Sequence, residues 1–188
     1  KEIIKDISGM KIRVPKEYME LEGMDEEVKH IIEKQIEALK KMGCKIEPIS
    51  LPHTKYAVPV YYIVVPSEDS SNMGRLDAIR YGVQEKGDSL YDVYANSRRN
   101  GFPEEVKRRI MVGTYALSAG YYDAYYKKAQ KVRPLNRQDF ENAFSKVDLL
   151  VTPTSPFPAF GLGEKKDDII SMYLADVFVS PGAVAGIP

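Results

Sequence analysis

The stretch KIRVPKEYMELEGMDEEVKHIIEKQIEALKKMGCKIEPI, residues 11–49, carries the clearest structural pattern in the chain. Residues 11–14 alternate between polar and apolar side chains, as a strand does. From Asp25 onward the apolar residues recur at helical spacing, which predicts a helix of about 17 residues with Asp25 as its N-cap and Gly43 just beyond its end. Residues 44–49 predict a second strand. This strand–helix–strand order favours a right-handed crossover into a parallel sheet.

The middle of the chain is predominantly helical and rich in tyrosine. Residues 56–72 fit the periodicity of a strand or of a helix, and Pro59 and Pro66 argue against either as a regular element. Two firmer helices are predicted over residues 103–118 and 121–146, and a proline in the second is expected to kink it.

Strand chemistry returns near the end of the sequence. Residues 148–152 form a short apolar run stopped by a proline, which is typical of a buried strand. An irregular loop is predicted over residues 153–163 and a short helix over 168–178. We expect the three strands to share one sheet, with the helices of residues 103–146 packed outside it.

Composition excludes several classes of function. The chain of 188 residues has 27 basic and 27 acidic side chains, so a nucleic-acid platform that works by bulk charge is disfavoured. Its longest apolar stretch, residues 57–66, is much shorter than the roughly 18 residues that a helix needs to cross a bilayer. The first residues do not resemble a secretion signal, and with a single cysteine no internal disulfide forms. We therefore expect a cytoplasmic protein without membrane attachment.

Cysteine and histidine usage narrows the possible chemistry further. Cys44 lies in an alternating apolar pattern, which favours a small buried thiol over a reactive one. His30 and His53 are the only histidines, and neither has a second ligand at metal-binding spacing. A zinc site and a histidine-based triad are both disfavoured. The sequence also contains no Gly-Xaa-Ser-Xaa-Gly elbow and no phosphate-cradling loop.

Two groups of cations are candidate binding residues. Arg109 directly precedes apolar Ile110 in a predicted helix, and a buried guanidinium needs an acidic partner or an anionic ligand such as a carboxylate. Spacing alone favours the alternative, an exposed or internally paired arginine. The second group could form an RNA-facing patch, although solvated lysines on a helix surface are commoner, and the neighbouring tyrosines fit an amphipathic core better than a base-stacking platform. The group comprises Lys127, Lys128, Lys131, Arg133 and Arg137.

Four runs closely resemble the A-subunit family of the aspartyl/glutamyl-tRNA amidotransferases, which are amidase-signature enzymes. They are SSNMGRLDAIRYG (70–82), KRRIMVGTYALSAGYYDAYYKKAQKVR (107–133), VTPTSP (151–156) and MYLAD (172–176). The resemblance covers essentially the whole chain and implies an α/β amidase-signature fold, a mixed sheet surrounded by helices. The chain then corresponds to the C-terminal part of a single amidase-type domain, in which residues 1–51 form the strand–helix–strand unit, 52–147 a helical region and 148–188 a strand and loops.

The resemblance also implies an activity. Members of this family hydrolyse glutamine with a Ser–cis-Ser–Lys triad and pass ammonia to a partner subunit, which amidates glutamate misacylated on glutamine tRNA. The triad belongs to a glycine- and serine-rich signature that is expected upstream of Lys1, so no catalytic residue and no metal site are expected in this chain, and the chain alone is expected to be inactive. The implied partners are the amidotransferase B and C subunits, glutamine and misacylated tRNA. ATP and magnesium are implied for the partner subunit only.

Three positions match substrate-binding residues of the family. Tyr61 matches the first of two paired tyrosines, Arg109 the arginine that receives the glutamine α-carboxylate, and Asp176 the aspartate that receives its α-ammonium. The resemblance therefore implies that Arg109 and Asp176 converge on one cleft with Tyr61 on its wall. A general amidase of the same superfamily and a non-catalytic assembly module remain as alternatives.

Overall fold

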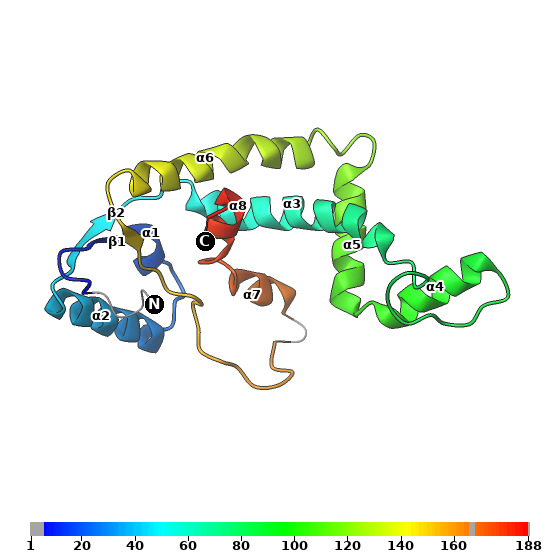
Figure 1. Cartoon of the computed structure of the whole chain (residues 1–188), viewed down its shortest axis with the longest axis horizontal. Helices are drawn as coiled ribbons and strands as arrows, with labels where there is room; N and C mark the ends of the chain where they lie inside the picture. The colour runs from blue at the N-terminus through cyan, green and yellow to red at the C-terminus, as the bar shows by residue number, and fades with distance from the viewer. Residues whose placement is uncertain (1–5, 166–167, 188) are drawn as a thin grey trace. The chain divides into compact units, whose positions relative to one another are not determined.

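A computed structural model describes residues 6–165 and 168–187 and contains a three-stranded parallel sheet (Figure 1). The strands are β1 (Lys11–Pro15), β2 (Lys45–Ile49) and β3 (Leu149–Leu150), in the order β2-β1-β3. Ile12 is paired with Ile46 on one side and Leu149 on the other, and its side chain is almost fully buried. The prediction of one sheet for these three strands is confirmed, although β3 is shorter than the apolar run suggested.

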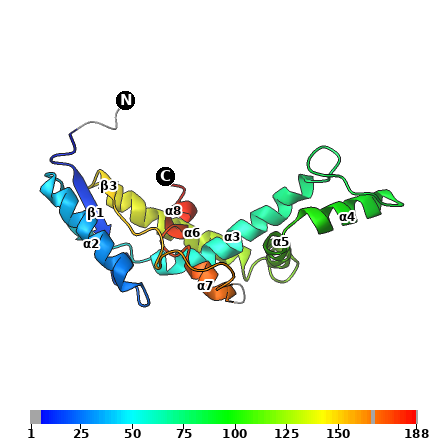
Figure 2. The ribbon, with the colours of Figure 1, turned by 90° about the horizontal axis from the view of Figure 1, so that it is seen from below.

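The crossover between β1 and β2 is made by helix α2 (Glu26–Lys41), which lies against the sheet (Figure 2). The Asp25 side chain accepts hydrogen bonds from the N–H groups of Glu27 and Val28, which confirms it as the N-cap. Gly43 has a φ of 89°, and its N–H donates to the carbonyl of Lys40, so the left-handed conformation that ends the helix falls on the residue that tolerates it. Cys44 follows and is buried, as predicted.

The chain divides into two compact units, one made of residues 1–61 with 132–188 and the other of residues 62–131. In the first unit, helix α6 (Tyr126–Phe144) contributes Phe140 and Ala143 to a core shared with Leu51 and Ala185. This confirms that the C-terminal half of α6 covers the sheet, because Leu150 of β3 packs against the same core. The packing of the earlier helix outside the sheet stays a prediction, since that helix belongs to the second unit.

Helix α3 (Ala57–Asn72) corrects the interpretation of residues 56–72 as irregular. Pro59 lies in the first turn, where a backbone N–H has no helical partner to lose. Pro66 lies inside the helix and removes one backbone hydrogen bond, but it is almost fully buried. Its backbone packs so closely on Gly113 of helix α5 (Glu104–Leu117) that a Cβ there would lie 1.9 Å from the Pro66 carbonyl oxygen. Burial against α5 therefore offsets the missing bond.

Other helices differ from the predictions in extent. Helix α4 (Leu90–Gly101) was not predicted, although Ser89 and Asp92 form a reciprocal capping box at its start. Helix α6 begins at Tyr126 instead of Tyr121 and continues through Pro134 to Phe144, and the kink expected at Pro134 stays a prediction. The short elements are α1 (Lys16–Met19), η1 (Thr54–Tyr56), η2 (Met73–Arg75), α7 (Ile169–Leu174) and α8 (Ser180–Ala185), the last of which was not predicted. Across residues 6–165 and 168–187, none of the helices combines the length and apolarity needed to span a bilayer.

Candidate functional site

Arg109, on α5, contacts Glu105 and Tyr62 within the second unit. Its Nε–H donates to Oε1 of Glu105, one turn earlier, at 3.0 Å. Its guanidinium carbon lies 5.5 Å from the ring centroid of Tyr62 on α3, which is within cation–π range. The side chain is 27% exposed, so the pair is partly shielded from water. The cation is thus fixed along one edge by a carboxylate and on one face by an aromatic ring.

A cavity of about 220 Å³ opens beside this arginine. One wall comes from α3 and η2, through Asp69 and Met73, and the other from α5. The α5 residues that line it are Glu105, Val106, Arg109 and Ile110. A guanidinium and two carboxylates therefore line an otherwise apolar hollow, an arrangement that can take a small molecule with a charged group.

The structure places the other two predicted ligands in the first unit. Tyr61 is half-buried on α3, at the last position before the unit boundary. Asp176 is half-buried in the turn between α7 and α8, and its backbone carbonyl accepts the N–H of Ser180 at 2.8 Å. Because Arg109 belongs to the second unit, convergence of the three residues on one cleft stays a prediction.

Glu105 is a site residue that our sequence interpretation missed. A signal was present, because a glutamate four residues before an arginine on a helix is the spacing that forms an ion pair. That pairing also supports the sequence alternative in which Arg109 is internally paired. An internal partner at Nε does not conflict with ligand binding, since a guanidinium carries five N–H donors.

The cationic group on α6 is used largely for contacts within the chain. Lys127 donates to Asp123 at 3.0 Å, a hydrogen bond that raises the pKa of the lysine, and Arg137 donates to Glu141 at 2.8 Å. Arg133 donates through Nε to the backbone carbonyl of Val184 at 2.9 Å. These contacts favour the helix-surface interpretation over an RNA-facing patch.

The tyrosine cluster that precedes α6 corrects another interpretation. Tyr115, Tyr121 and Tyr125 are each more than 40% exposed, so they do not form the amphipathic core that their spacing suggested. Residues 121–125 form a turn instead of helix, and the turn brings the ring centroids of Tyr115 and Tyr121 to 4.3 Å. A hydrogen bond with Tyr121 raises the pKa of Tyr115 to about 12.

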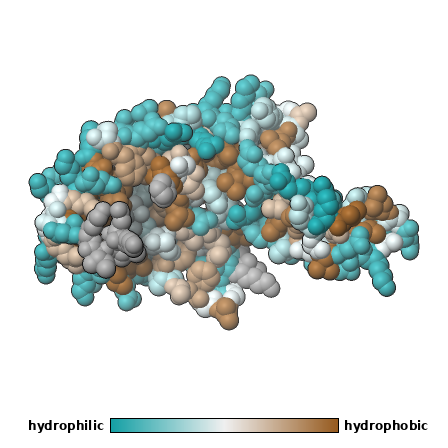
Figure 3. All heavy atoms as spheres, in the orientation of Figure 1, coloured by the Kyte–Doolittle hydropathy of each residue, from teal (hydrophilic) through white to brown (hydrophobic). Residues whose placement is uncertain are grey.

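Apolar side chains are also exposed over α4 and the loop before it (Figure 3), where Val83 and Tyr91 are the most exposed.

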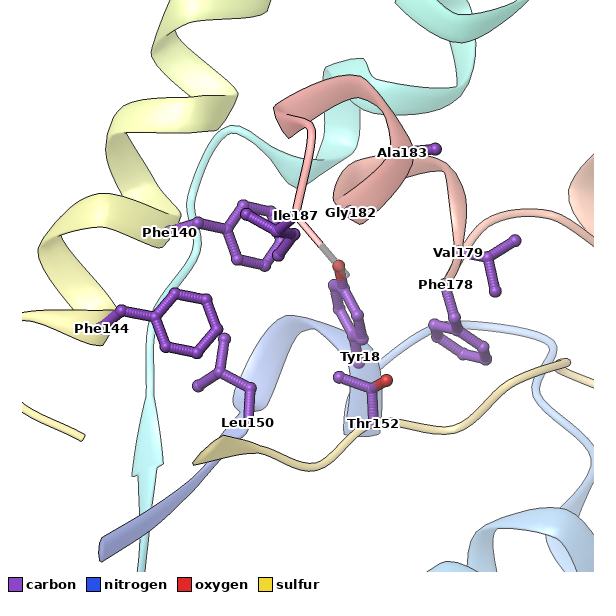
Figure 4. A pocket seen from close by; sticks show the side chains of 10 residues that line it. All are labelled: Tyr18, Phe140, Phe144, Leu150, Thr152, Phe178, Val179, Gly182, Ala183 and Ile187. Carbon is purple, nitrogen blue, oxygen red and sulfur yellow. The ribbon is translucent and has the colours of Figure 1, made fainter. Parts of the chain in front are cut away.

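A second cavity, of about 270 Å³, lies in the first unit between α6, β3 and α8 (Figure 4). Aromatic and aliphatic side chains form most of its lining, among them Phe140, Phe178 and Ile187. The rings of Tyr18 and Phe178 lie with centroids 5.3 Å apart, and burial raises the pKa of Tyr18. This hollow lacks the charged groups found beside Arg109, so we do not assign it a polar substrate.

Two carboxylates fix the loop that follows β2. Glu17 accepts hydrogen bonds from the hydroxyl of Ser50 and the N–H of Leu51. Burial alone would raise the pKa of Glu17, but these hydrogen bonds outweigh it, and the pKa lies below its ordinary value. Asp139 accepts a hydrogen bond from the backbone N–H of His53 at 2.8 Å, and its other oxygen lies 2.9 Å from Nδ1 of the same histidine.

No group of three or more histidine, cysteine or acidic side chains arranged to bind a metal occurs in the described part of the chain.

The chain matches a known protein family over its whole length. The family model described as "Amidase" matches residues 1–188. Curated relatives named as the A-subunit of glutamyl-tRNA(Gln) amidotransferase include one from Thermodesulfovibrio yellowstonii, 55% identical over 184 residues, and one from Koribacter versatilis, 57% identical over 188 residues. These matches cover 98% and 100% of the chain, but 38% and 39% of the relatives. The chain therefore spans about two fifths of the length of the curated relatives it matches.

Solved structures show the same relationship. The crystal structure of the glutamyl-tRNA(Gln) amidotransferase A-subunit from Thermotoga maritima is 39% identical, with a TM-score of 0.70, and the match covers 99% of this chain and 35% of that one. A crystal structure described as an amidase is 19% identical, with a TM-score of 0.67 over 97% of this chain and 37% of that one, and supports the fold alone. These likenesses confirm the α/β fold class expected from the sequence.

Proposed function

Because the chain belongs to the amidase family, we propose that it contributes the amino-acid-binding part of a subunit that releases ammonia from glutamine for tRNA-dependent amidation. The observation that carries this proposal is the identity of 55–57% over nearly the whole chain to subunits named for amidation of glutamyl-tRNA(Gln). The charged cavity beside Arg109 supports it, because glutamine differs from a simple amide by its charged α-carboxylate and α-ammonium.

In this proposal each end of glutamine meets an opposite charge. Arg109 takes the α-carboxylate, since its planar guanidinium matches a carboxylate in a two-pronged hydrogen-bonded pair. Asp176 takes the α-ammonium, and Tyr61 forms a wall of the cleft. Opposite charges at the two ends select an amino acid over an amide that lacks both groups, because a missing partner would leave a desolvated charge unpaired.

The remaining chemistry is assigned elsewhere in the assembly. Hydrolysis of the side-chain amide, which converts glutamine and water into glutamate and ammonia, is assigned to the serine and lysine groups that the family resemblance implies, and none of these is placed in the 188 residues. Activation of the tRNA-bound glutamate with ATP and magnesium is assigned to the partner subunit. The B and C subunits, misacylated tRNA and the cytoplasm are proposed as partners and location on the same basis.

A chimeric protein tests the proposal directly. The chain replaces the matched 184 residues of the Thermodesulfovibrio yellowstonii A-subunit, and the product is assembled with the other subunits of that enzyme. We expect it to convert glutamyl-tRNA(Gln) to glutaminyl-tRNA(Gln) with either glutamine or ammonium chloride as the nitrogen donor. The unmodified assembly is the positive control.

Two results would overturn the proposal. Activity with ammonium chloride but none with glutamine would show that the chain does not supply the glutamine site. Hydrolysis of simple amides at a rate equal to that of glutamine would favour the general amidase alternative.

A further inference from the structure

The first turn of α5 carries two adjacent glutamates with different partners. Glu104 pairs with Lys107 at 2.9 Å and is highly exposed, with 86% of its side chain accessible. Glu105 is less exposed, accepts from Arg109 through Oε1, and accepts from Arg108 through Oε2. Only Glu105 of these two lines the cavity beside Arg109. The two residues therefore have the same charge and are adjacent in the first turn of the helix, but only one of them contacts Arg109 and the cavity.

The contact with Glu105 restrains the orientation of the Arg109 guanidinium. A hydrogen bond at Nε fixes rotation about the end of the side chain, and the Tyr62 ring lies against one face of the guanidinium. Arginine otherwise loses side-chain rotamer entropy when it engages a ligand. Restraining it beforehand lowers the entropic cost of binding, which is the general benefit of preorganisation.

A carboxylate beside a carboxylate-binding arginine would normally weaken that site through repulsion. Here Arg108 also binds Glu105, so the negative charge of Glu105 is shared between two arginines, and Asp69 is the second carboxylate that lines the cavity. Glu105 can thus orient Arg109 while Arg108 offsets part of its negative charge.

We propose that Glu105 is a positioning residue that orients Arg109 toward the α-carboxylate of glutamine. This inference rests on the proposed function, because the substrate is taken from it. Glu105 acts through Arg109, so its contribution should appear in substrate binding and not in the chemical step.

The test uses the chimeric assembly with Glu105→Gln, which removes the charge and keeps the size of the side chain. We expect the KM for glutamine to rise about five- to tenfold, because the charge-assisted bond to Arg109 is only partly shielded from water. The kcat with glutamine and the rate with ammonium chloride should change by less than about twofold. Glu104→Gln is the matched control and should leave the KM for glutamine unchanged.

A double-mutant cycle shows whether Glu105 acts through Arg109. In an Arg109→Lys background, Glu105→Gln should change the KM for glutamine by less than about twofold, since the partner of the interaction is already altered. A full five- to tenfold effect in that background would overturn the inference.

Failure of the inference can be separated from failure of the proposed function. If Arg109→Lys raises the KM for glutamine and Glu105→Gln does not, the positioning role is wrong and the glutamine site stands. If Glu105→Gln lowers activity with both donors equally, Glu105 is structural and the inference is again wrong. If Arg109→Lys leaves glutamine use unchanged, the proposed function fails and the inference fails with it.

Discussion

Replacing Gly113 with alanine should destabilise the second unit through one backbone contact. A Cβ at position 113 would lie 1.9 Å from the carbonyl oxygen of Pro66, 2.4 Å from its carbonyl carbon and 2.8 Å from the N atom of Ser67. All three are backbone atoms of α3, so no side-chain rotation relieves the overlap. Real Cβ contacts are essentially never shorter than 3.0 Å, and α3 and α5 would have to separate locally by about 1 Å.

The expected loss of stability follows from two opposing terms. Overpacking in a well-packed region costs about 1–3 kcal/mol, and rigid backbone on the opposing side favours the upper end of that range. Alanine recovers about 1 kcal/mol because it prefers the helix more strongly than glycine does. The net loss is then about 2 kcal/mol, which corresponds to a fall of roughly 4–8 °C in melting temperature for a chain of this size.

Thermal unfolding followed by circular dichroism measures this change. Gly101→Ala is the matched control, because Gly101 ends α4 and a Cβ there would meet nothing within 4 Å. That substitution should leave the melting temperature unchanged or raise it slightly. Equal melting temperatures for the two variants would refute the close packing of α5 on Pro66.

Further predictions concern the substrate, two carboxylates and the isolated chain. Arg109→Lys in the chimeric protein should weaken the use of glutamine about ten- to a hundredfold, because lysine keeps the positive charge but loses the two-pronged geometry. Activity with ammonium chloride should be unchanged. An equal loss of activity with both nitrogen donors in steady-state kinetics would mark Arg109 as structural. Glu17→Gln should lower the free energy of unfolding by roughly 1 kcal/mol at pH 7, after discounting for the partial exposure of Glu17. A carboxylate whose pKa is lowered by folding stabilises the fold only at a pH above that pKa. The difference in stability between the variant and the unmodified chain should therefore disappear as the pH falls through the lowered pKa of Glu17. Urea titrations at several pH values, with exposed Glu20→Gln as control, measure this, and a pH-independent deficit would contradict it. Asp139→Asn should lower the free energy of unfolding by about 1–3 kcal/mol, because the buried carboxylate that accepts two hydrogen bonds from His53 becomes an amide. Equal free energies of unfolding in urea for the variant and the unmodified chain would count against this prediction. The chain of 188 residues alone should release no ammonia from glutamine above a buffer blank, and measurable release would disprove the expectation that its catalytic serines and lysine lie elsewhere.

Local patterns predicted the part of the fold in which they agree with tertiary packing. The alternation before Pro15, the capping Asp25 and the left-handed Gly43 each had one consistent interpretation, and the structure confirms all three. The prediction for residues 56–72 was wrong because the cost of Pro66 is offset by contact with Gly113 of α5, which lies 47 residues later in the sequence. Helix α4 was missed although its capping box was present, because its apolar spacing was not recognised.

The candidate site was predictable only in part. The family resemblance identified Arg109, whereas spacing alone favoured an internally paired arginine, and the structure shows such a pair with Glu105. The exposure of Tyr121 and Tyr125 could not be predicted from periodicity, since both lie in a turn that interrupts the helical pattern. The expected convergence of Arg109 with Asp176 stays a prediction, because it concerns residues of different units and no local pattern carries that information.

The order of the strands has a consequence for synthesis of the chain. β1 lies in the middle of the sheet, and β2 follows it after a single crossover, so this pair can form as soon as residue 49 has emerged from the ribosome. The other edge of β1 pairs with Leu149 and Leu150, about 100 residues later. At translation speeds of 5–20 residues per second, that edge stays open for about 5–20 seconds. During this interval unpaired backbone groups beside Ile12 are available to other nascent chains, so protection by a chaperone would matter most before the third strand arrives.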